Sequence, residues 1–328
     1  MAKKLLLGIF VGVFFVYLSF RGVDLGGVLT GLKSARLWYI APTGALLVTI
    51  QLLRSYRWGI ILKPIKSIDQ SSLFPVSNVG FLAMVAIPAR IGEFARPYLI
   101  STKTGVSLSS ALGTILVERV FDSLSILILF FVVFLFIPLP PWLIKGGVLL
   151  FCIILTLFGL MAVLIFRKKD ALDVLTPLLR KFPQRWHAAL EGFTRNLIDG
   201  FKILPHGRSM CYLALLSITI WAIDAMAMYT LFFAFNLDLP LPAAFVLMVI
   251  IIMGIAIPAA PGFVGNWHFF CVLGLGLFGV HKADALTYAI VLHFLSIGII
   301  AILGVASLPF NRFSLSDIKR RFSARQDG

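Results

Sequence analysis

The sequence predicts an all-α integral membrane protein with about six full transmembrane helices and two re-entrant broken-helix hairpins in an inverted repeat. Of its 328 residues, 60% are hydrophobic and only 13% are charged, and the mean hydropathy is +1.00. A soluble domain carries about twice that share of charge. Several mostly apolar runs reach about 18 residues or more, which is long enough to cross a bilayer. Two further apolar segments are interrupted by proline and glycine. Together these features predict a single polytopic membrane domain over residues 1–328.

Six apolar runs fit full crossings. The first, within "MAKKLLLGIFVGVFFVYLSFRG", resembles a signal peptide, but no small-residue cleavage site follows it. We therefore expect it to be retained as a membrane helix. The six expected crossings are residues 5–20, 38–60, 108–137, 146–166, 209–235 and 284–306.

The two interrupted segments do not fit a simple crossing. Residues 73–101 begin with a short apolar piece and then meet "AIPARIGEFARP", and residues 243–280 contain "IAIPAAPGFVG" at the corresponding place. Proline disfavours continuation of the preceding helix. Broken backbone at membrane depth is tolerated only where protein or a wet cavity covers it. Each segment is therefore predicted to be a pair of half-helices that enters the bilayer and returns.

An internal repeat relates these two segments. "AIPARIGEFARPYLI" at 86–100 aligns with "AIPAAPGFVGNWHFF" at 256–270, and after a four-residue shift "ALGTILVERV" aligns with "ALTYAIVLHF". The predicted repeat halves are 73–137 and 243–306. Because the two hairpins are expected to enter from opposite sides, the plan is the inverted repeat of many transporters, which bind substrate near the midplane between broken helices.

The distribution of charge predicts the orientation. The net charge is +15, but it is not the stripe interleaved with aromatic residues that nucleic-acid binding would require. Residues 167–208 hold nine Lys and Arg against four acids, and residues 311–328 hold five against two. The positive-inside rule places both segments, and both termini, in the cytoplasm of a cell with this protein in its cytoplasmic (inner) membrane. The connector 167–208 contains a basic amphipathic helix expected to lie on the cytoplasmic leaflet.

The charged break of the first hairpin is a candidate phosphate site. A half-helix that starts near Arg90 would point free N–H groups at an anion, and Gly92 permits close approach of the backbone. Arg90 and Arg96 could add bidentate hydrogen bonds to the same phosphate. Glu93 could orient one arginine or meet a cationic group of the substrate. The alternative is that these charges form ion pairs at the cytoplasmic interface.

A second candidate is the stripe in "VERVFDSLS" at residues 117–125. Glu118 and Asp122 are four residues apart on one helix face, and Arg119 can pair with Asp122. Intramembrane ionisable residues face the interior and are functional candidates. Substrate binding, a proton-coupling pair and a structural ion pair that holds this helix to a hairpin all remain open.

The second hairpin is neutral and offers polar contacts. Gly262 and Gly265 suit close backbone approach, and Asn266 and His268 can contact substrate, although a hydrogen-bonded structural role is favoured for His268. Asp224 is a further intramembrane acid, structural or functional. Two other arginines, Arg54 and Arg57, lie near the cytoplasmic end of the second crossing. They are expected to snorkel to the interface, and the alternative is that they line a headgroup entrance.

No cofactor or resident metal is expected. Cys152, Cys211 and Cys271 lie far apart in apolar runs without a Cys/His cluster, which predicts buried hydrophobes and no zinc site. The chain has no Walker A motif, so hydrolysis of ATP is not expected.

The charged motifs resemble a known family. "P-x-R-x-G-E-x-x-R" from Pro88 to Arg96, "V-E-R-x-x-D" from Val117 to Asp122 and "P-G-x-x-G" from Pro261 to Gly265 are similar to motifs of the lysylphosphatidylglycerol synthetase transmembrane-region family, also called flippase-like or UPF0104 proteins. The resemblance covers nearly the whole chain. It implies translocation between leaflets of a lipid, often one with a modified or phosphorylated headgroup. Many members carry Glu where this chain has His268, so a role of that acid does not transfer.

The leading hypothesis is therefore lipid translocation, flippase or scramblase-like, with a phosphate-bearing headgroup bound between the two broken hairpins. One alternative is a non-transporting lipid-binding partner of a glycosyltransferase or lipid synthase. Another is an integral-membrane enzyme that acts on a lipid phosphate. The expected partners are a membrane lipid and, in the first alternative, a lipid-modifying enzyme; nucleic acid is not expected.

Overall fold

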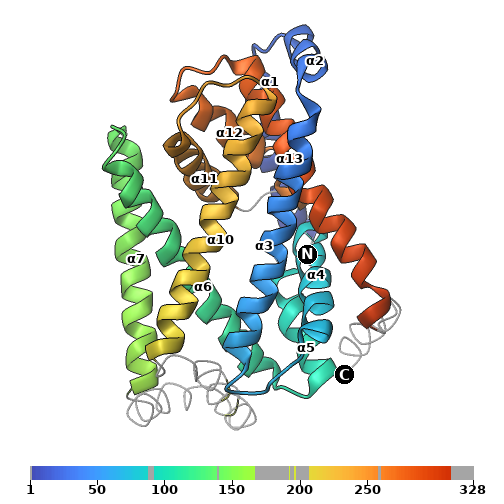
Figure 1. Ribbon diagram of the computed structural model, residues 1–328, viewed down its shortest axis with the longest axis vertical. Helices are drawn as coiled ribbons and strands as arrows, with labels where there is room; N and C mark the ends of the chain where they lie inside the picture. The colour runs from blue at the N-terminus through green and yellow to red at the C-terminus, as the bar shows by residue number, and fades with distance from the viewer. Residues whose placement is uncertain are drawn as a thin grey trace.

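The computed structural model is helical throughout the residues that it describes, which are 2–87, 92–138, 140–166, 192, 196, 207–257 and 260–311. Within these ranges there are eleven α-helices, a few short 3₁₀ turns and no strands. The long helices run roughly along one axis of an elongated bundle (Figure 1). The basic connector and the C-terminal segment that the sequence places in the cytoplasm lie almost wholly outside the described residues.

Every predicted crossing coincides with an α-helix. Leu108 follows Ser107, whose side chain accepts a hydrogen bond from the amide of Ser110 at 3.1 Å and so caps the helix that the sequence places at 108–137. The six helices are α1 (Ala2–Phe20), α3 (Ile40–Leu62), α6 (Leu108–Phe134), α7 (Pro141–Phe166), α10 (Gly207–Ala234) and α13 (Lys282–Ser307).

By length and apolarity, fewer of these helices qualify on their own as membrane spans. Among the described residues three do, namely 37–62, 207–234 and 282–307, and a fourth span arises if the bent pair 10–20 and 25–34 counts as one. α6 has three charged residues near its middle, and α7 runs into residues whose side chains are not described. The part of the chain that the structure describes therefore contains three to four candidate membrane spans, as in a multi-pass membrane protein, against the six that the sequence predicts.

Both interrupted segments form two helices with a break between them. α4 (Gln70–Ala86) ends before the charged motif, residues 92–94 form a 3₁₀ turn, and α5 (Ala95–Thr104) follows. α11 (Leu241–Ile255) likewise ends before the 3₁₀ turn η3 (Pro261–Phe263), and α12 (Asn266–Gly276) follows. The positions of the breaks agree with the proline and glycine residues of the sequence.

One helix was not predicted. The connection at 21–37 contains α2 (Leu25–Ser34), whose N-cap Asp24 accepts hydrogen bonds from the amides of Gly26 at 2.9 Å and Gly27 at 3.1 Å. The bend between α1 and α2 is 82°. Two adjacent glycines in the first turn weaken helix propensity, so the cap was the available signal.

The helices of the two predicted repeat halves pack in matching pairs. α4 packs on α5 as α11 packs on α12, and α5 packs on α6 as α12 packs on α13. Across the halves, α4 contacts α13 as α11 contacts α6. The helix before each half fits the same scheme. α3 contacts α4, α6 and α13, and α10 makes the equivalent contacts with α11, α13 and α6. α3 and α10 also pack on each other.

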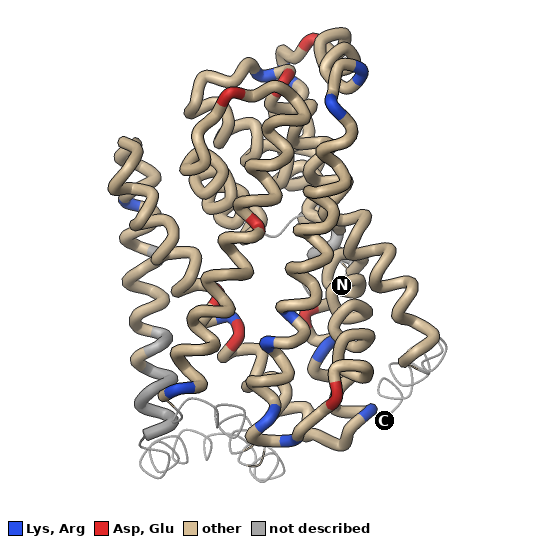
Figure 2. Tube along the Cα trace, viewed as in Figure 1, with Lys and Arg blue, Asp and Glu red and all other residues tan. Residues whose placement is uncertain are grey.

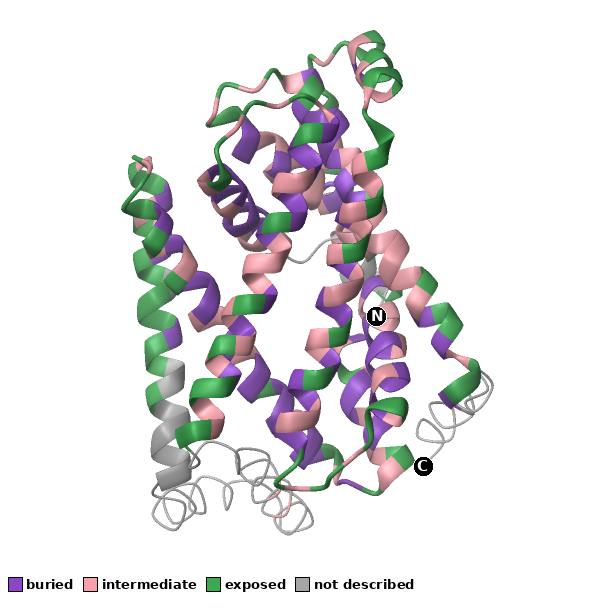
Figure 3. Ribbon diagram, viewed as in Figure 1, coloured by how far each residue is buried: buried purple, intermediate pink, exposed green. Residues whose placement is uncertain are grey.

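Charge and burial follow the bundle. Lys, Arg, Asp and Glu lie mainly toward the two ends of the long axis and in the lower half of the bundle, with one acidic position near mid-height and one basic position on α7 (Figure 2). α11 is buried over most of its length, whereas the described side chains of α7 are largely exposed apolar groups (Figure 3). Large exposed apolar surfaces of this kind mark contact with a membrane or a partner.

Candidate functional site

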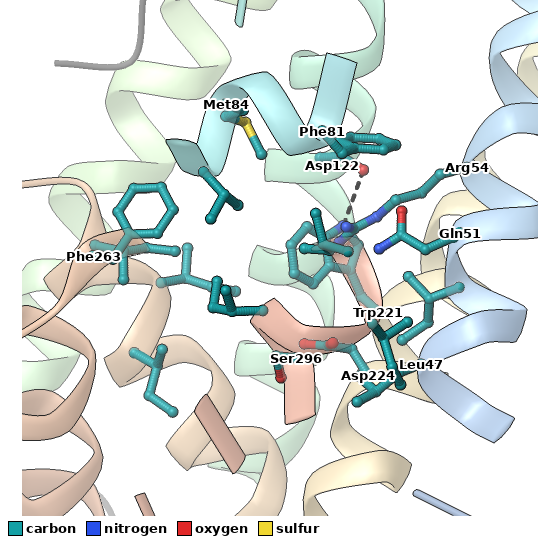
Figure 4. Close-up of a pocket in the computed structure, with 18 of the residues that line it drawn as sticks. Leu47, Gln51, Arg54, Phe81, Met84, Asp122, Trp221, Asp224, Phe263 and Ser296 are labelled. Carbon is teal, nitrogen blue, oxygen red and sulfur yellow. Dashed lines mark hydrogen bonds between the residues drawn. The ribbon is translucent and has the colours of Figure 1, made fainter. Parts of the chain in front are cut away.

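A cavity of about 180 Å³ lies where both helix breaks meet the long helices. Glu93 reaches it from the first break, and Phe263 and Trp267 reach it from the second. The remaining wall comes from α3, α4, α6, α10, α11 and α13, and most of it is apolar. Figure 4 shows Arg54 and Gln51 extending into this space from α3 and Asp224 from α10.

Glu118 and Asp122 of α6 contribute carboxylates to the cavity wall. Arg57, which does not line the cavity, neutralises both of them. Arg57 Nη1 donates to Asp122 Oδ1 and, at 2.7 Å, to Ser217 Oγ, and Arg57 Nη2 lies 3.5 Å from Glu118 Oε1. The Arg57 side chain is 0% exposed. The expectation that Arg57 snorkels to the interface is therefore wrong, because its carboxylate partners lie inside the bundle.

Arg96 completes this network from α5. Its guanidinium donates two hydrogen bonds to Glu118, at 2.8 and 3.0 Å, in the bidentate geometry that favours arginine over lysine. The same group stacks on the rings of Trp58 and Phe81, with its Cζ 4.3 and 4.7 Å from their centroids. Arg96 is therefore a buried tie between α5, α6, α3 and α4. Binding of a phosphate by Arg96 would require it to leave Glu118.

Asp122 has two further neighbours. Trp221 Nε1 donates to its Oδ1 at 3.0 Å, which is the dashed bond in Figure 4. Arg119 Nη1 lies 4.0 Å from its Oδ2, and the Arg119 side chain is 43% exposed. The network of Arg57, Arg96, Glu118 and Asp122 thus leaves Arg119 loosely held at the edge of the cavity.

Arg54 differs from the other arginines of the site. It forms no hydrogen bond or ion pair with any described residue, and its Cζ lies 5.7 and 5.5 Å from the ring centroids of Phe81 and Trp221. Two other polar atoms in the cavity wall, Gln51 Oε1 and Trp267 Nε1, have no hydrogen-bond partner among the described residues. A guanidinium held between two aromatic faces with its N–H groups unsatisfied can accept an anion.

The second break is held by backbone geometry and two histidines. Gly262 and Gly265 have φ of +67° and +92°, and a Cβ at Gly265 would collide with the carbonyl of Gly12 in α1. Gly262 O lies 2.7 Å from the Nε2 of His293, which is a neighbour of His268 with ring centroids 4.7 Å apart. His268 Nδ1 accepts from the Gly265 amide at 3.4 Å. These contacts agree with the structural role favoured for His268.

Some of the predicted site residues line the cavity, and others hold helices together beside it. Glu93, Glu118, Arg119 and Asp122 line the cavity. Arg96 lies behind it, and Gly92 packs so closely on α4 that a Cβ would collide with the backbone of Ala83 and Met84. Asn266 is fully buried and donates to the carbonyls of Gly254 and Ile257, both at 3.1 Å, so it ties α12 to the end of α11. Arg90 lies outside the described residues.

Three cavity residues were not selected by sequence reasoning as substrate contacts. These polar residues are Gln51 and Trp221, for which no role was expected, and Arg54, which was expected to snorkel or to line a headgroup entrance. Their signal was available only in part, because an arginine near a helix end is typical of snorkelling, and a glutamine or tryptophan in an apolar helix has no spacing that distinguishes it. Among the residues that the structure describes, no three His, Cys, Asp or Glu side chains gather as metal ligands.

Comparison with known proteins extends over the whole of this architecture. A family model described as "Lysylphosphatidylglycerol synthase TM region" matches residues 5–304. The chain is 25% identical over 312 residues to a UPF0104 membrane protein of Methanothermobacter thermautotrophicus, covering 89% of this chain and 91% of that protein. It is 32% identical over 161 residues to a UPF0104 membrane protein of Methanocaldococcus jannaschii, covering 47% of this chain and 61% of that protein. No solved structure matches the chain.

Proposed function

The chain belongs to the lysylphosphatidylglycerol synthase TM region family, and from that premise we propose that it moves a phosphate-bearing lipid between the leaflets of the cytoplasmic membrane. The headgroup occupies the cavity between the two helix breaks, and the acyl chains stay in the bilayer. The cavity volume supports placing only the headgroup inside. It is about 180 Å³, which is smaller than the roughly 300–1,000 Å³ of sites that enclose a whole drug-sized ligand.

The observation that carries the proposal is Arg54. Arg54 lines the cavity and forms no hydrogen bond or ion pair with any described residue, so its N–H groups can bind an anion, and the headgroup phosphate is the anion that such a lipid carries. Arg119, whose side chain is 43% exposed at the cavity edge, provides a second contact for the lipid phosphate as the headgroup moves between the cavity and water. In this proposal Arg96, Glu118, Asp122 and Arg57 form the frame, because their charges already satisfy one another.

The proposed architecture is six crossings with two re-entrant hairpins in an inverted repeat. What supports it is the matching of helix contacts between the two halves, since α3 to α6 and α10 to α13 pack by the same scheme. The scheme also extends the proposed repeat halves to include α3 and α10. In an inverted repeat the substrate site lies between the broken helices, which is where both breaks reach the cavity.

The test is leaflet exchange in liposomes that contain only this purified protein. The probe is a fluorescent phosphatidylglycerol whose outer-leaflet fraction is measured by a membrane-impermeant quencher. We expect exchange above protein-free liposomes, and we expect Arg54→Gln to reduce it about tenfold or more, since a charge-assisted contact contributes about 1.5–3 kcal/mol. Lys33→Gln, an exposed change on α2, is the matched control and should exchange like the wild type.

Two results would replace this proposal by the alternatives. Tight lipid binding without exchange would favour a binding partner that presents lipid to another enzyme. A change in the mass of the recovered lipid would favour an enzyme acting on the lipid phosphate.

A further inference from the structure

The cavity holds a second charged group without a contact partner, the carboxylate of Asp224. Its α10 position faces the same space as Arg54 (Figure 4). Asp224 forms no hydrogen bond, and no ion pair within 4.0 Å, with any described residue. By contrast, the two acids that α6 contributes to the cavity, Glu118 and Asp122, are neutralised by arginines at contact distance. The proton-coupling role that the sequence allowed for the Glu118 and Asp122 pair therefore fits Asp224 better.

Arg54 and Asp224 are related by the repeat. The offset of 170 residues that aligns Ala86 with Ala256 also aligns Arg54 with Asp224. Both lie on the two helices that pack on each other across the halves, α3 and α10. Opposite charges thus occupy equivalent positions on the two sides of one cavity, and each is a source of the other's electrostatic field.

When a lipid phosphate is bound, the phosphate and the Asp224 carboxylate compete for the positive charge of Arg54. In the empty cavity the positive field of Arg54 supports the charged form of Asp224. A lipid phosphate that contacts Arg54 cancels that field and places two negative charges beside one positive charge in a low-dielectric space. Such a charge is expensive at membrane depth, and a proton on the carboxylate removes it.

We propose that Asp224 takes up one proton from water when a lipid phosphate binds at Arg54 and releases that proton to water when the phosphate leaves. This inference rests on the proposed function and adds to it a proton linkage of lipid binding. The loaded cavity then carries the same net charge as the empty one, so the headgroup moves without net charge.

The charged and titratable groups around Asp224 leave it as the group that responds. From α3 the facing group is Arg54, and from α6 the facing groups are Glu118, Arg119 and Asp122. Glu118 is neutralised by Arg96 and Arg57. Glu93 reaches the same cavity from the first break and has an interaction partner of its own. α11 contains no titratable residue. From α13 the neighbour is Tyr288, whose hydroxyl donates to Met228 O at 2.8 Å. Asp122 is held by Arg57 and Trp221, and the tyrosine hydroxyl is already used.

The experiment is calorimetric binding of a short-chain phosphatidylglycerol to the purified full-length protein in detergent. Its phosphodiester keeps one negative charge between about pH 5.5 and 8.5. Titrations in buffers of different ionisation enthalpy count the protons taken up per lipid. For the wild type we expect close to one proton, and an affinity that falls up to about tenfold per pH unit once the unliganded carboxylate is ionised.

Two variants make the test specific. Asp224→Asn should bind with no proton uptake and with an affinity that no longer changes with pH. Asp238→Asn, an exposed change in the connection after α10, is the matched control and should retain the wild-type proton count.

Binding by the wild type without proton uptake would overturn the linkage and leave the proposed function intact. The linkage also fails if Asp224→Asn retains the proton count, or if it weakens only a zwitterionic short-chain phosphatidylethanolamine, since Asp224 would then meet an ammonium group. If the wild type binds neither lipid, the proposed function itself fails.

Discussion

Arg54 and Arg57 stand three residues apart on α3 and have opposite roles. Arg57 is fully buried between Asp122, Glu118 and Ser217, whereas Arg54 faces the cavity and forms no ion pair with any residue that the structure describes. Removing one partner of a buried ion pair leaves an uncompensated charge, which costs far more than the net stabilisation by the intact pair. We therefore expect the stability of the bundle to depend on Arg57 and the proposed lipid movement to depend on Arg54.

Arg57→Met should destabilise the protein by about 3–5 kcal/mol, seen as a lower melting temperature in detergent. Arg54→Met breaks no ion pair and loses only contacts to two aromatic faces, so its cost should be about 1 kcal/mol. Adding Asp122→Asn to Arg57→Met should restore part of the loss, because it removes one of the two stranded carboxylates. Equal destabilisation by the two single variants would contradict the assignment of Arg57 to the frame.

Sequence reasoning found the acids of this network but not their principal partner. The spacing of Glu118 and Asp122 places both on one helix face, which periodicity can predict. Arg57 is 65 residues from Asp122. No local sequence pattern predicts that α3 packs against α6 at the positions of these two residues. For Arg54 the same limit applies, because its isolation is a property of the packed cavity.

At the scale of elements, the helix breaks were predictable because their causes are local. Pro88 and Gly92, and Pro258 and Gly262, interrupt apolar runs at matching places, and helices end beside both. What local chemistry could not supply is how closely the pieces pack. Gly92 lies against the backbone of Ala83 and Met84, and Gly265 lies against Gly12 of α1, so each glycine fixes a contact between two elements.

Gly92→Ala should separate α5 from α4, since its Cβ would overlap backbone atoms that cannot rotate away. We expect destabilisation of about 1–3 kcal/mol, as for overpacking in a core, and lipid exchange reduced more than the amount of folded, membrane-inserted protein. Gly298→Ala in α13 is the matched control, because a Cβ there meets nothing within 4 Å. Normal exchange by Gly92→Ala would show that the first break does not need this close approach.

Gly265→Ala tests the corresponding contact of the second break. Its φ of +92° is unfavourable for any residue with a Cβ, and the added methyl meets the Gly12 carbonyl. We expect a lower melting temperature and, because α1 is displaced from α12, greater accessibility of the N-terminal helix to limited proteolysis. Gly276→Ala, at the end of α12 with open space around its Cβ, should change neither measurement.

At the scale of the whole molecule, the proposed inverted repeat predicts that equivalent connections lie on opposite sides of the membrane. The connection between α3 and α4 and the connection between α10 and α11 are equivalent under the repeat, and three proposed crossings, α6, α7 and α10, separate them along the chain. A re-entrant hairpin, as proposed for both breaks, would return the chain to the side from which it entered and would not change the number of crossings. The positive-inside rule assigns the first connection to the cytoplasm.

Cysteine labelling of intact cells with an impermeant thiol reagent tests this arrangement. Ser67 and Asp238 are exposed in the two equivalent connections. The unsubstituted chain gives the background, because Cys152 and Cys211 are exposed and not buried as the sequence predicts, whereas Cys271 is buried. We expect Asp238→Cys to label in intact cells and Ser67→Cys to label only after permeabilisation, because the two halves insert with opposite orientation. Labelling of both sites from the same side would show that the halves are not inverted. In that case the repeat would not explain how the cavity opens to each side of the membrane in turn. Movement of the lipid headgroup would then require a different path.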